Sequence, residues 1–426
     1  MLRDRRIAGL LLGDLLANVG TGMLLVAMPV QTLSLHGDVP KAIAIGLVEA
    51  APFVLSTALA LAIGLGRVRV PPRTLLVADC LLRSLTFAVL GVLAVTGRLT
   101  LPVLVAGLLF GATFRLAGSS SRRLLATSAA GEAGRFSVNG LLGLNTTFAL
   151  YIAGPVLGGV VVATAGAGFA LFVDASGALI LLAATLACVP RGTEGRDALR
   201  DEGTHESGWR ILRRRPVAAR LLVVEFFFNF LYMPVEVALP LYVSATLHAG
   251  ASGLGVLWGA LGIGAFLGAA LVGRLRNLPQ RPLLVAIIGL WALCPLALAL
   301  TGDLTVALLV FGLGGLVYAP FTPVAYSFLQ SGLAPGEQQQ VVTLWTTGST
   351  LAAPLGLAMG GPLIELAGST GGLVLSGLLT LLLLPIAACA LRGFAPGRGL
   401  RHPEPPKSPR AVLGRTTERN PTCASA

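Results

Sequence analysis

Twelve long apolar runs divide the sequence, and each is long enough to cross a lipid bilayer as a helix. About 20 apolar residues span the hydrocarbon core in this form. Only 12% of the residues are charged, whereas about 25% are charged in a typical soluble domain. The sequence therefore predicts an all-α integral membrane protein and excludes a soluble globular enzyme. The runs cover residues 7–35, 42–65, 74–96, 101–120, 137–163, 166–189, 218–245, 253–273, 283–302, 304–328, 341–366 and 370–391.

The basic residues indicate how these helices are oriented in the membrane. Of the 31 Lys and Arg, 27 lie at the N-terminus, in alternate loops or after the last run, whereas only Lys41 and Arg98 lie in the other loops. Loops rich in Lys and Arg stay in the cytoplasm. We therefore expect both termini and the central loop on the cytoplasmic side of the inner membrane. The net charge of +12 then reflects topology and does not indicate nucleic-acid binding.

The two halves of the chain share a sequence pattern. Asp14, Asn18 and Pro29 in the first run recur as Glu225, Asn229 and Pro240 in the seventh, each 211 residues later. Comparable spacing relates the second run to the eighth and the fifth to the eleventh. Transporters are often built from such repeats. We expect two pseudo-symmetric six-helix bundles, residues 1–190 and 218–393, joined by a cytoplasmic loop, 191–217, and followed by a disordered cytoplasmic tail, 394–426.

Several motifs resemble those of the major facilitator superfamily. The fifth run carries Gly154-Pro155-Val-Leu-Gly158-Gly159, which is similar to the G-P-x-x-G-G signature of antiporters in that superfamily. The segments Phe169–Ala175, Trp209–Pro216 and Gly336–Gln340 are similar to stretches of its enterobactin-exporter-like, drug efflux subfamily. The resemblance implies the major facilitator fold, twelve transmembrane helices in two bundles, and a secondary active transporter that works by alternating access.

One motif departs from the superfamily pattern. The turn after the second run reads Gly64-Leu-Gly66-Arg67-Val-Arg69 and lacks the acidic residue that is usual there. In the superfamily that residue pairs with cytoplasmic charges and helps to hold one gate state. The usual gating switch is therefore in doubt, and Arg67 is retained only as a candidate gate contact.

Asp14 and Glu225 are the main candidates for proton coupling. A charge inside the membrane is costly, so it marks a transport pathway, a proton relay or a structural pair. Both carboxyl groups lie at the same depth of repeat-related helices, and Asn18 and Asn229 follow one turn later on the same faces. The resemblance places these helices around a central cavity. Burial favours the neutral form of a carboxyl group, as a proton-coupled step requires; the alternative is that either residue only tethers an arginine.

The remaining membrane charges have less specific interpretations. Asp79 and Arg83 are four residues apart and are predicted to form an intramembrane pair. Arg115 is expected either to reach the lipid headgroups or to bind an anion. Glu49 is assigned either to the cavity or to the membrane interface, and Glu236 to an outer gate. Asp174 is expected to be structural.

The fifth run is expected to form a bendable inner helix. Pro155 removes a backbone hydrogen bond, and Gly154, Gly158 and Gly159 allow a neighbouring helix to approach closely. Such a helix suits rocking of one bundle against the other, although tight packing alone is the alternative.

No catalytic, metal or cofactor site is predicted. The sequence contains no phosphate-binding loop of an ATP-driven pump, no Cys/His cluster and no Ser/His arrangement. The glycines between Gly262 and Gly268 lie inside an apolar run and are not interpreted as a nucleotide site. The favoured function is proton-coupled export of a small amphiphilic organic molecule by a chain that functions as a monomer in the lipid bilayer. The alternatives are a metabolite importer on the same fold and a membrane sensor or scaffold that does not transport.

Overall fold

The computed structural model describes residues 5–64, 67–68, 70–189, 208–275, 278–333 and 335–392, and within these ranges every regular element is a helix. The helices are α1 (Arg5–Leu35), α2 (Lys41–Gly64), α3 (Pro72–Val95), α4 (Leu101–Gly111), α5 (Arg115–Phe148), the π-helix η1 (Ala149–Ala153), α6 (Gly154–Ala165), α7 (Ala167–Cys188), α8 (Gly208–Arg214), α9 (Pro216–Ala245), α10 (Ala251–Leu275), α11 (Gln280–Ala299), α12 (Leu304–Tyr318), α13 (Phe321–Ser331) and α14 (Pro335–Ala390).

The described helices confirm the predicted membrane architecture. Eleven segments are long and apolar enough to cross a membrane, and the last of them, Gln340–Ala390, has 51 residues. This segment contains Gly368 with φ of 74°, a conformation that only glycine adopts without strain, so α14 consists of two spans joined by a kink. The structure therefore contains the twelve predicted spans.

Two helix boundaries differ from the prediction. The fourth run was expected to end in a loop near residue 120, but α4 ends at Gly111 and α5 remains helical through that loop as far as Phe148. Ten of the 16 residues from Ser121 to Phe136 are Ala, Leu, Arg or Glu, all of which favour helix. In the tenth run, the helix is interrupted between Tyr318 and Phe321, where Pro320 separates α12 from α13.

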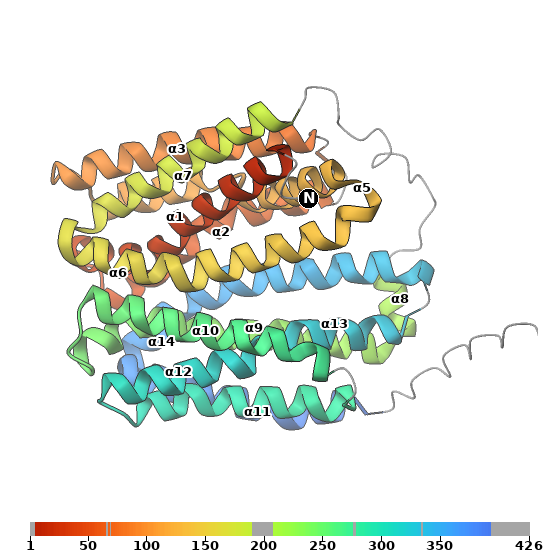
Figure 1. Ribbon diagram of the computed structural model, residues 1–426. Coiled ribbons are helices and arrows are strands. Elements are labelled where there is room, and N and C mark those ends of the chain that lie inside the picture. Colours follow the sequence, from red (N-terminus) through yellow and green to blue (C-terminus); the bar gives the residue numbers. More distant parts are fainter. Residues whose placement is uncertain are drawn as a thin grey trace, which may run out of the picture.

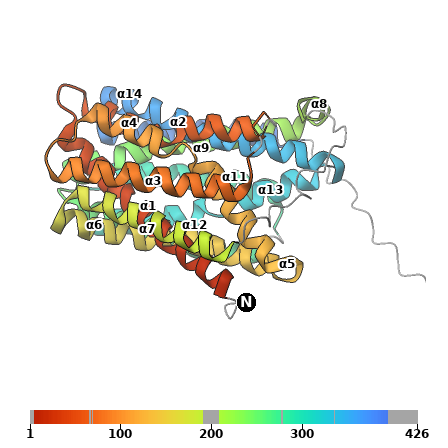
Figure 2. The same ribbon diagram turned by 90° about the horizontal axis from the view of Figure 1, so that it is seen from above.

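The helices form two bundles that lie side by side (Figures 1 and 2). The first contains α1 to α7 and the second contains α9 to α14, as expected for the major facilitator fold. We call the end where α1 begins and α8 lies the basic end, because it carries Arg73, Arg123, Arg215, Arg274 and Arg281. Lys41 and Arg98 lie at the opposite end.

Glycines bring the two bundles into close contact near the opposite end. At Gly255 of α10, a Cβ atom would lie 3.0 Å from the Cα of Gly159 in α6. At Gly46 of α2, it would lie 3.2 Å from the Cα of Gly361 in α14. Backbones can approach this closely only where side chains are absent. The repeat relates these two crossings to each other, because α2 corresponds to α10 and α6 corresponds to the first span of α14. Together they close the opposite end of the interface between the bundles.

Two of the sequence motifs meet at the basic end. Arg215, which follows α8, forms an ion pair of 3.1 Å with Glu337 in the first turn of α14. This contact links the Trp209–Pro216 and Gly336–Gln340 segments. The predicted central loop begins outside the described residues, which resume at α8, and the predicted tail, 394–426, also lies outside them. The domain boundaries remain predictions.

Candidate functional site

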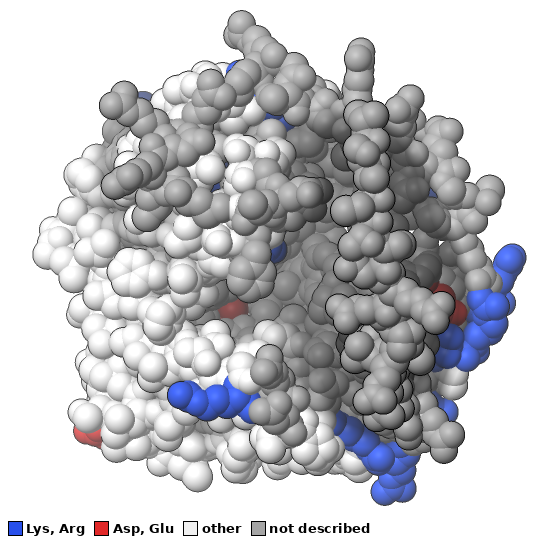
Figure 3. Space-filling view, turned by 45° about the vertical axis from the view of Figure 1, so that its right-hand side comes forward, with Lys and Arg blue, Asp and Glu red and all other residues white. Residues whose placement is uncertain are grey.

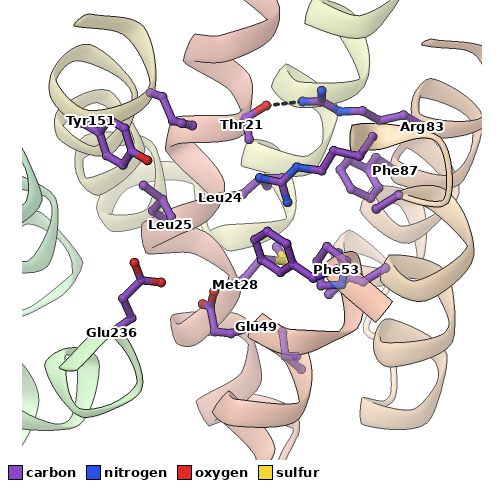
Figure 4. Close-up of a pocket in the computed structure, with 16 residues that line it drawn as sticks. Thr21, Leu24, Leu25, Met28, Glu49, Phe53, Arg83, Phe87, Tyr151 and Glu236 are labelled. Atoms are coloured by element: carbon purple, nitrogen blue, oxygen red, sulfur yellow. Dashed lines mark hydrogen bonds between the residues drawn. The ribbon is translucent and has the colours of Figure 1, made fainter. Parts of the chain in front are cut away.

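A cavity of about 130 Å³ lies between the two bundles. We call it the interface cavity. It contains charged side chains from both bundles in a largely apolar lining. Figure 4 shows Glu49 of α2 and Glu236 of α9 pointing into the same space, with Tyr151 nearby. Its lining residues are Thr21, Leu24, Leu25, Met28, Val48, Glu49, Pro52, Phe53, Arg83, Phe87, Leu108, Ala112, Arg115, Leu150, Tyr151 and Glu236.

Arg115 is the cation of the interface cavity that forms no carboxylate ion pair with any other described residue. Its guanidinium lies 4.9 Å from the centroid of the Phe53 ring, which is within cation–π range. The expectation that Arg115 reaches the lipid headgroups is therefore wrong, because its side chain turns inward between the bundles. Glu49, whose location the sequence left open, lies in the cavity rather than at the membrane interface.

A second cavity, of about 340 Å³, lies closer to the basic end. We call it the basic-end cavity. Figure 3 shows the face at this end hollowed at its centre, with acidic and basic atoms inside the hollow. Phe53 lines both cavities and lies between them. The lining residues are Phe53, Leu116, Glu225, Asn229, Thr322, Trp345, Thr346, Ser349, Thr350 and Ala353.

Glu225 is the carboxylate of the basic-end cavity. Its side chain is buried, and its Oε1 accepts a hydrogen bond of 3.1 Å from the Ser349 hydroxyl of α14. Its Oε2 is also buried and has no hydrogen-bond partner among the described residues. Asn229, one turn later, donates to the Glu225 backbone carbonyl at 2.9 Å and accepts from the Tyr318 hydroxyl at 3.0 Å. Glu225 and Asn229 thus lie beside a cavity, and their role in proton coupling stays a prediction.

Asp14 has a different environment from its repeat counterpart. It forms a buried ion pair of 2.8 Å with Arg122 of α5, and Asn18 and Asn145 donate hydrogen bonds to its carboxylate. Asp14 and Asn18 line neither of the two cavities. Asp14 therefore lines neither of the described cavities, and its ion pair with Arg122 fits the alternative of a tethered arginine. The reason is that α5 continues as a helix and brings Arg122 onto α1.

Arg83 also has a different partner from the predicted one. Its Nε donates to Asp174 of α7 at 2.7 Å, and a second guanidinium nitrogen contacts Asp174 and the Thr21 hydroxyl of α1. The direct ion pair of Arg83 is thus with Asp174 and not with Asp79, which interacts with it only at longer range, because α3 packs along α7 and presents Arg83 to the fully buried Asp174. Asp79 is buried against Gly118, and its Oδ1 has no hydrogen-bond partner among the described residues.

The glycines of the fifth span pack against two different helices. A Cβ atom at Gly154 or Gly158 would collide with backbone of α1, at Gly22 and Met23, in the same bundle. A Cβ atom at Gly159 would collide with α10 in the other bundle. The π-helix η1 directly precedes Pro155, whose ring cannot fit against the carbonyl four residues earlier in a regular helix. The predicted inner helix is thus tightly packed and irregular at the proline.

The glycines from Gly262 to Gly268 also have a packing role. The Tyr151 carbonyl of η1 packs directly against Gly262, and backbone atoms of α12 pack directly against Gly264 and Gly268. Arg67 is exposed in the turn between α2 and α3 and lines neither cavity. Its proposed gate contact therefore gains no partner from the described geometry.

Sequence reasoning missed several polar residues of the site. Ser349, Tyr318 and Tyr232 lie in apolar runs, where single hydroxyl groups give little signal. Arg122 was assigned to a loop. Helical periodicity did offer one signal, because Glu225, Asn229, Tyr232 and Glu236 are spaced by four, three and four residues, which places them on one face of a helix.

The chain matches the transmembrane secretion effector family over residues 2–393. It is 31% identical over 377 residues to the multidrug efflux pump Tap of Mycolicibacterium fortuitum, an alignment that covers 84% of this chain and 89% of that protein. It is 30% identical over 383 residues to the multidrug efflux pump Tap of Mycobacterium tuberculosis strain H37Rv, covering 84% of this chain and 87% of that protein.

Solved structures show the same fold. A bacterial homologue of the human lysosomal transporter Spinster superposes with a TM-score of 0.67 at 17% identity, covering 91% of this chain and 96% of that chain. The nucleoside transporter NupG superposes with a TM-score of 0.70 at 10% identity, covering 91% of this chain and 99% of that chain. Both are transporters of the major facilitator fold that the sequence predicted. The chain belongs to the transmembrane secretion effector family, and it is a multi-pass membrane transporter of the major facilitator superfamily.

Proposed function

We propose that the chain is a proton-coupled exporter of small amphiphilic organic molecules that works by alternating access. The observation that carries this proposal is the basic-end cavity, which combines apolar and hydroxyl-bearing side chains with the single buried carboxylate of Glu225. Ligand sites commonly have such a mostly apolar lining with few polar groups. The Tap relatives are multidrug efflux pumps, which supports an organic substrate and export.

The two ends of the interface support alternating access. Near the opposite end, the bundles meet at the crossings of Gly159 with Gly255 and of Gly46 with Gly361. Near the basic end, the cavity separates them. Transporters of this type rock two bundles around a site near the middle of the membrane. With the basic end in the cytoplasm, as the arginines favour, this is a state that takes up substrate from inside the cell.

Glu225 is the carboxylate that we assign to proton coupling. The charge of Asp14 is balanced by Arg122, whereas Glu225 has a hydroxyl donor and an unpartnered buried oxygen. A buried carboxylate without a cation is stabilised by protonation or by a cationic group of the substrate. The two cavities are built from both bundles of one chain, which supports function as a monomer.

The test is transport of an amphiphilic dye, ethidium, into everted membrane vesicles energised by a proton gradient. We expect wild-type accumulation to stop when an uncoupler is added. Glu225→Gln is expected to lose gradient-driven accumulation while retaining dye exchange without a gradient. Glu365→Gln is the matched control, because Glu365 is exposed and lies at the opposite end. Accumulation that ignores the uncoupler would refute proton coupling, and a wild-type response from Glu225→Gln would refute the role of Glu225.

A further inference from the structure

Four polar side chains form a stripe along α9, an otherwise largely apolar helix. Glu225, Asn229, Tyr232 and Glu236 recur at intervals of four, three and four residues, so they share one face. Glu225 and Asn229 line the basic-end cavity, and Glu236 lines the interface cavity. The stripe therefore runs from one cavity to the other along the second bundle.

Tyr318, the last residue of α12, bridges the middle of this stripe. Its hydroxyl donates to Asn229 Oδ1 at 3.0 Å, and its ring stacks on the Tyr232 ring with the centroids 5.0 Å apart. Tyr232 lies one turn before Glu236 on the same face of α9, and the two side chains are close enough to interact electrostatically. Tyr232 and Tyr318 thus occupy the part of the stripe between Glu236 and Glu225.

Two orphaned polar atoms adjoin this path. Oε2 of Glu225 is buried without a hydrogen-bond partner among the described residues. The indole nitrogen of Trp291 is likewise buried without a hydrogen-bond partner among the described residues. The centroid of the Trp291 ring lies 5.3 Å from that of the Tyr232 ring and 4.9 Å from that of the Tyr318 ring. Buried polar groups without partners are rare in native structures and call for an explanation in function. Both of these lie along the same stripe.

Binding of one proton makes the charged groups of the interface cavity electrically neutral in sum. Glu49 and Glu236 are its two carboxylates, and Arg115 is its cation. Arg83 also lines it, but Asp174 neutralises that guanidinium. With both carboxylates ionised, the three groups sum to one negative charge, and a proton bound at Glu236 brings them to neutrality. Tyr151 is the other titratable side chain of this cavity, and Tyr318 is the titratable neighbour of Glu225.

We propose that this stripe is a proton relay, with Glu236 as the proton-binding group in the interface cavity and Glu225 as the acceptor in the basic-end cavity. The O–H bond of the Glu236 carboxyl breaks, the Tyr232 and Tyr318 hydroxyls each accept one proton and give up their own, and an O–H bond forms at Glu225. Asn229 holds the Tyr318 hydroxyl one helical turn from Glu225. The relay rests on the proposed function, since it supplies the path by which that transporter moves its protons.

The experiment compares two kinds of transport in liposomes that contain the purified full-length chain. Ethidium accumulation driven by a pH gradient needs net proton movement, whereas ethidium counterflow without a gradient needs only substrate binding and rocking. The variants are Tyr318→Phe and Tyr232→Phe, which keep the stacked rings and remove one hydroxyl each. Tyr326→Phe on α13 is the matched control, because Tyr326 lies outside the stripe and lines neither cavity.

We expect both relay variants to lose gradient-driven accumulation by about 100-fold or more, the lower end of the range for removing a positioned proton-transfer group, while counterflow stays near the wild-type rate. Their accumulation should also lose its pH dependence, whereas Tyr326→Phe should behave as wild type. Wild-type accumulation in both relay variants would overturn the relay and leave the proposed function intact. A parallel loss of counterflow would also overturn it, because the hydroxyls would then serve substrate binding.

A separate measurement keeps the two proposals distinguishable. If the wild-type chain carries ethidium in neither assay, the proposed substrate class fails. The relay is then tested by measuring proton uptake into the liposomes under an imposed membrane potential, without any substrate present. Slower uptake in Tyr318→Phe than in wild type would support the relay, and equal uptake would overturn it.

Discussion

The glycines of the fifth span allow a sharp test of how the opposite end closes. Gly158 and Gly159 are neighbours, but Gly158 packs on α1 in its own bundle and Gly159 packs on α10 in the other bundle. Substitution of either by Ala adds the same methyl group. We predict that Gly159→Ala shifts the equilibrium between conformations, whereas Gly158→Ala lowers the stability of the first bundle in every conformation.

The size of the effect follows from the contacts. A Cβ atom at Gly159 would lie 3.0 Å from the Cα of Ser252 and 3.3 Å from that of Gly255. Carbon atoms pack best at about 3.5–4.0 Å, so α6 and α10 must separate by roughly 0.5–1 Å. Overpacking of this kind costs about 1–3 kcal/mol. That cost falls only on the state in which the opposite end is closed, so its population should fall by roughly 5- to 150-fold relative to the open state.

The assay is a distance measurement between two spin labels. Asp38 and Ser369 line one hollow at the opposite end, in the loop after α1 and beside the α14 kink, and can be replaced by Cys in a chain whose five native cysteines are removed. Gly159→Ala should lengthen the distance between the labels. Gly158→Ala should leave the distance unchanged and lower the unfolding temperature.

Gly143→Ala serves as the control, because nothing lies within 4 Å of a Cβ atom at that position. An unchanged distance in Gly159→Ala would refute the assignment of this crossing as the closure of the opposite end. A longer distance in Gly158→Ala would refute the separation of the two glycines into different roles.

The buried ion pairs give two further predictions, both checked by thermal unfolding in detergent. Asp174→Asn should destabilise the chain by about 3–5 kcal/mol, because it leaves Arg83 buried without its counter-charge, and the double change Arg83→Met with Asp174→Leu should recover most of the loss. A double variant as unstable as the single one would contradict this reasoning. Arg122→Gln should be clearly less stable than Arg123→Gln, since Asp14 is buried beside Arg122 whereas Arg123 is exposed; equal stabilities would contradict the structural role of the Asp14 pair.

The spans could be predicted because lipid imposes a strong constraint on the sequence. Each crossing needs its own apolar run, and the break between the last two runs coincides with the kink at Gly368. Loop boundaries were less predictable. The segment that contains Arg122 was assigned to a loop because of its charge, but its Arg and Glu residues favour helix as its Ala and Leu residues do, and α5 continues through it.

The partners of the membrane charges could not be predicted from local spacing. The i, i+4 spacing predicted that Arg83 pairs with Asp79, but its ion-pair partner, Asp174, lies 91 residues away along the chain. Only the packing of α3 on α7 brings them together. The role of Tyr318 could not be predicted for a related reason, because an aromatic residue in an apolar run is most simply interpreted as a packing residue. Its contact with Asn229 appears only when α12 is placed against α9.

The repeat itself explains why one half of the molecule is suited to carry the chemistry. Asp14 and Glu225 occupy equivalent positions, yet Arg122 balances the first, and no cation among the described residues pairs with the second. Breaking the Asp14–Arg122 pair would leave a buried charge without its partner, so we expect α1 and α5 to stay joined throughout a transport cycle. Around Glu225 the second bundle instead places hydroxyl groups and stacked rings, which form hydrogen bonds with either protonation state. The pattern predicts that a proton changes contacts of the second bundle while the first acts as a rigid body, and the asymmetry is one that the sequence repeat alone conceals.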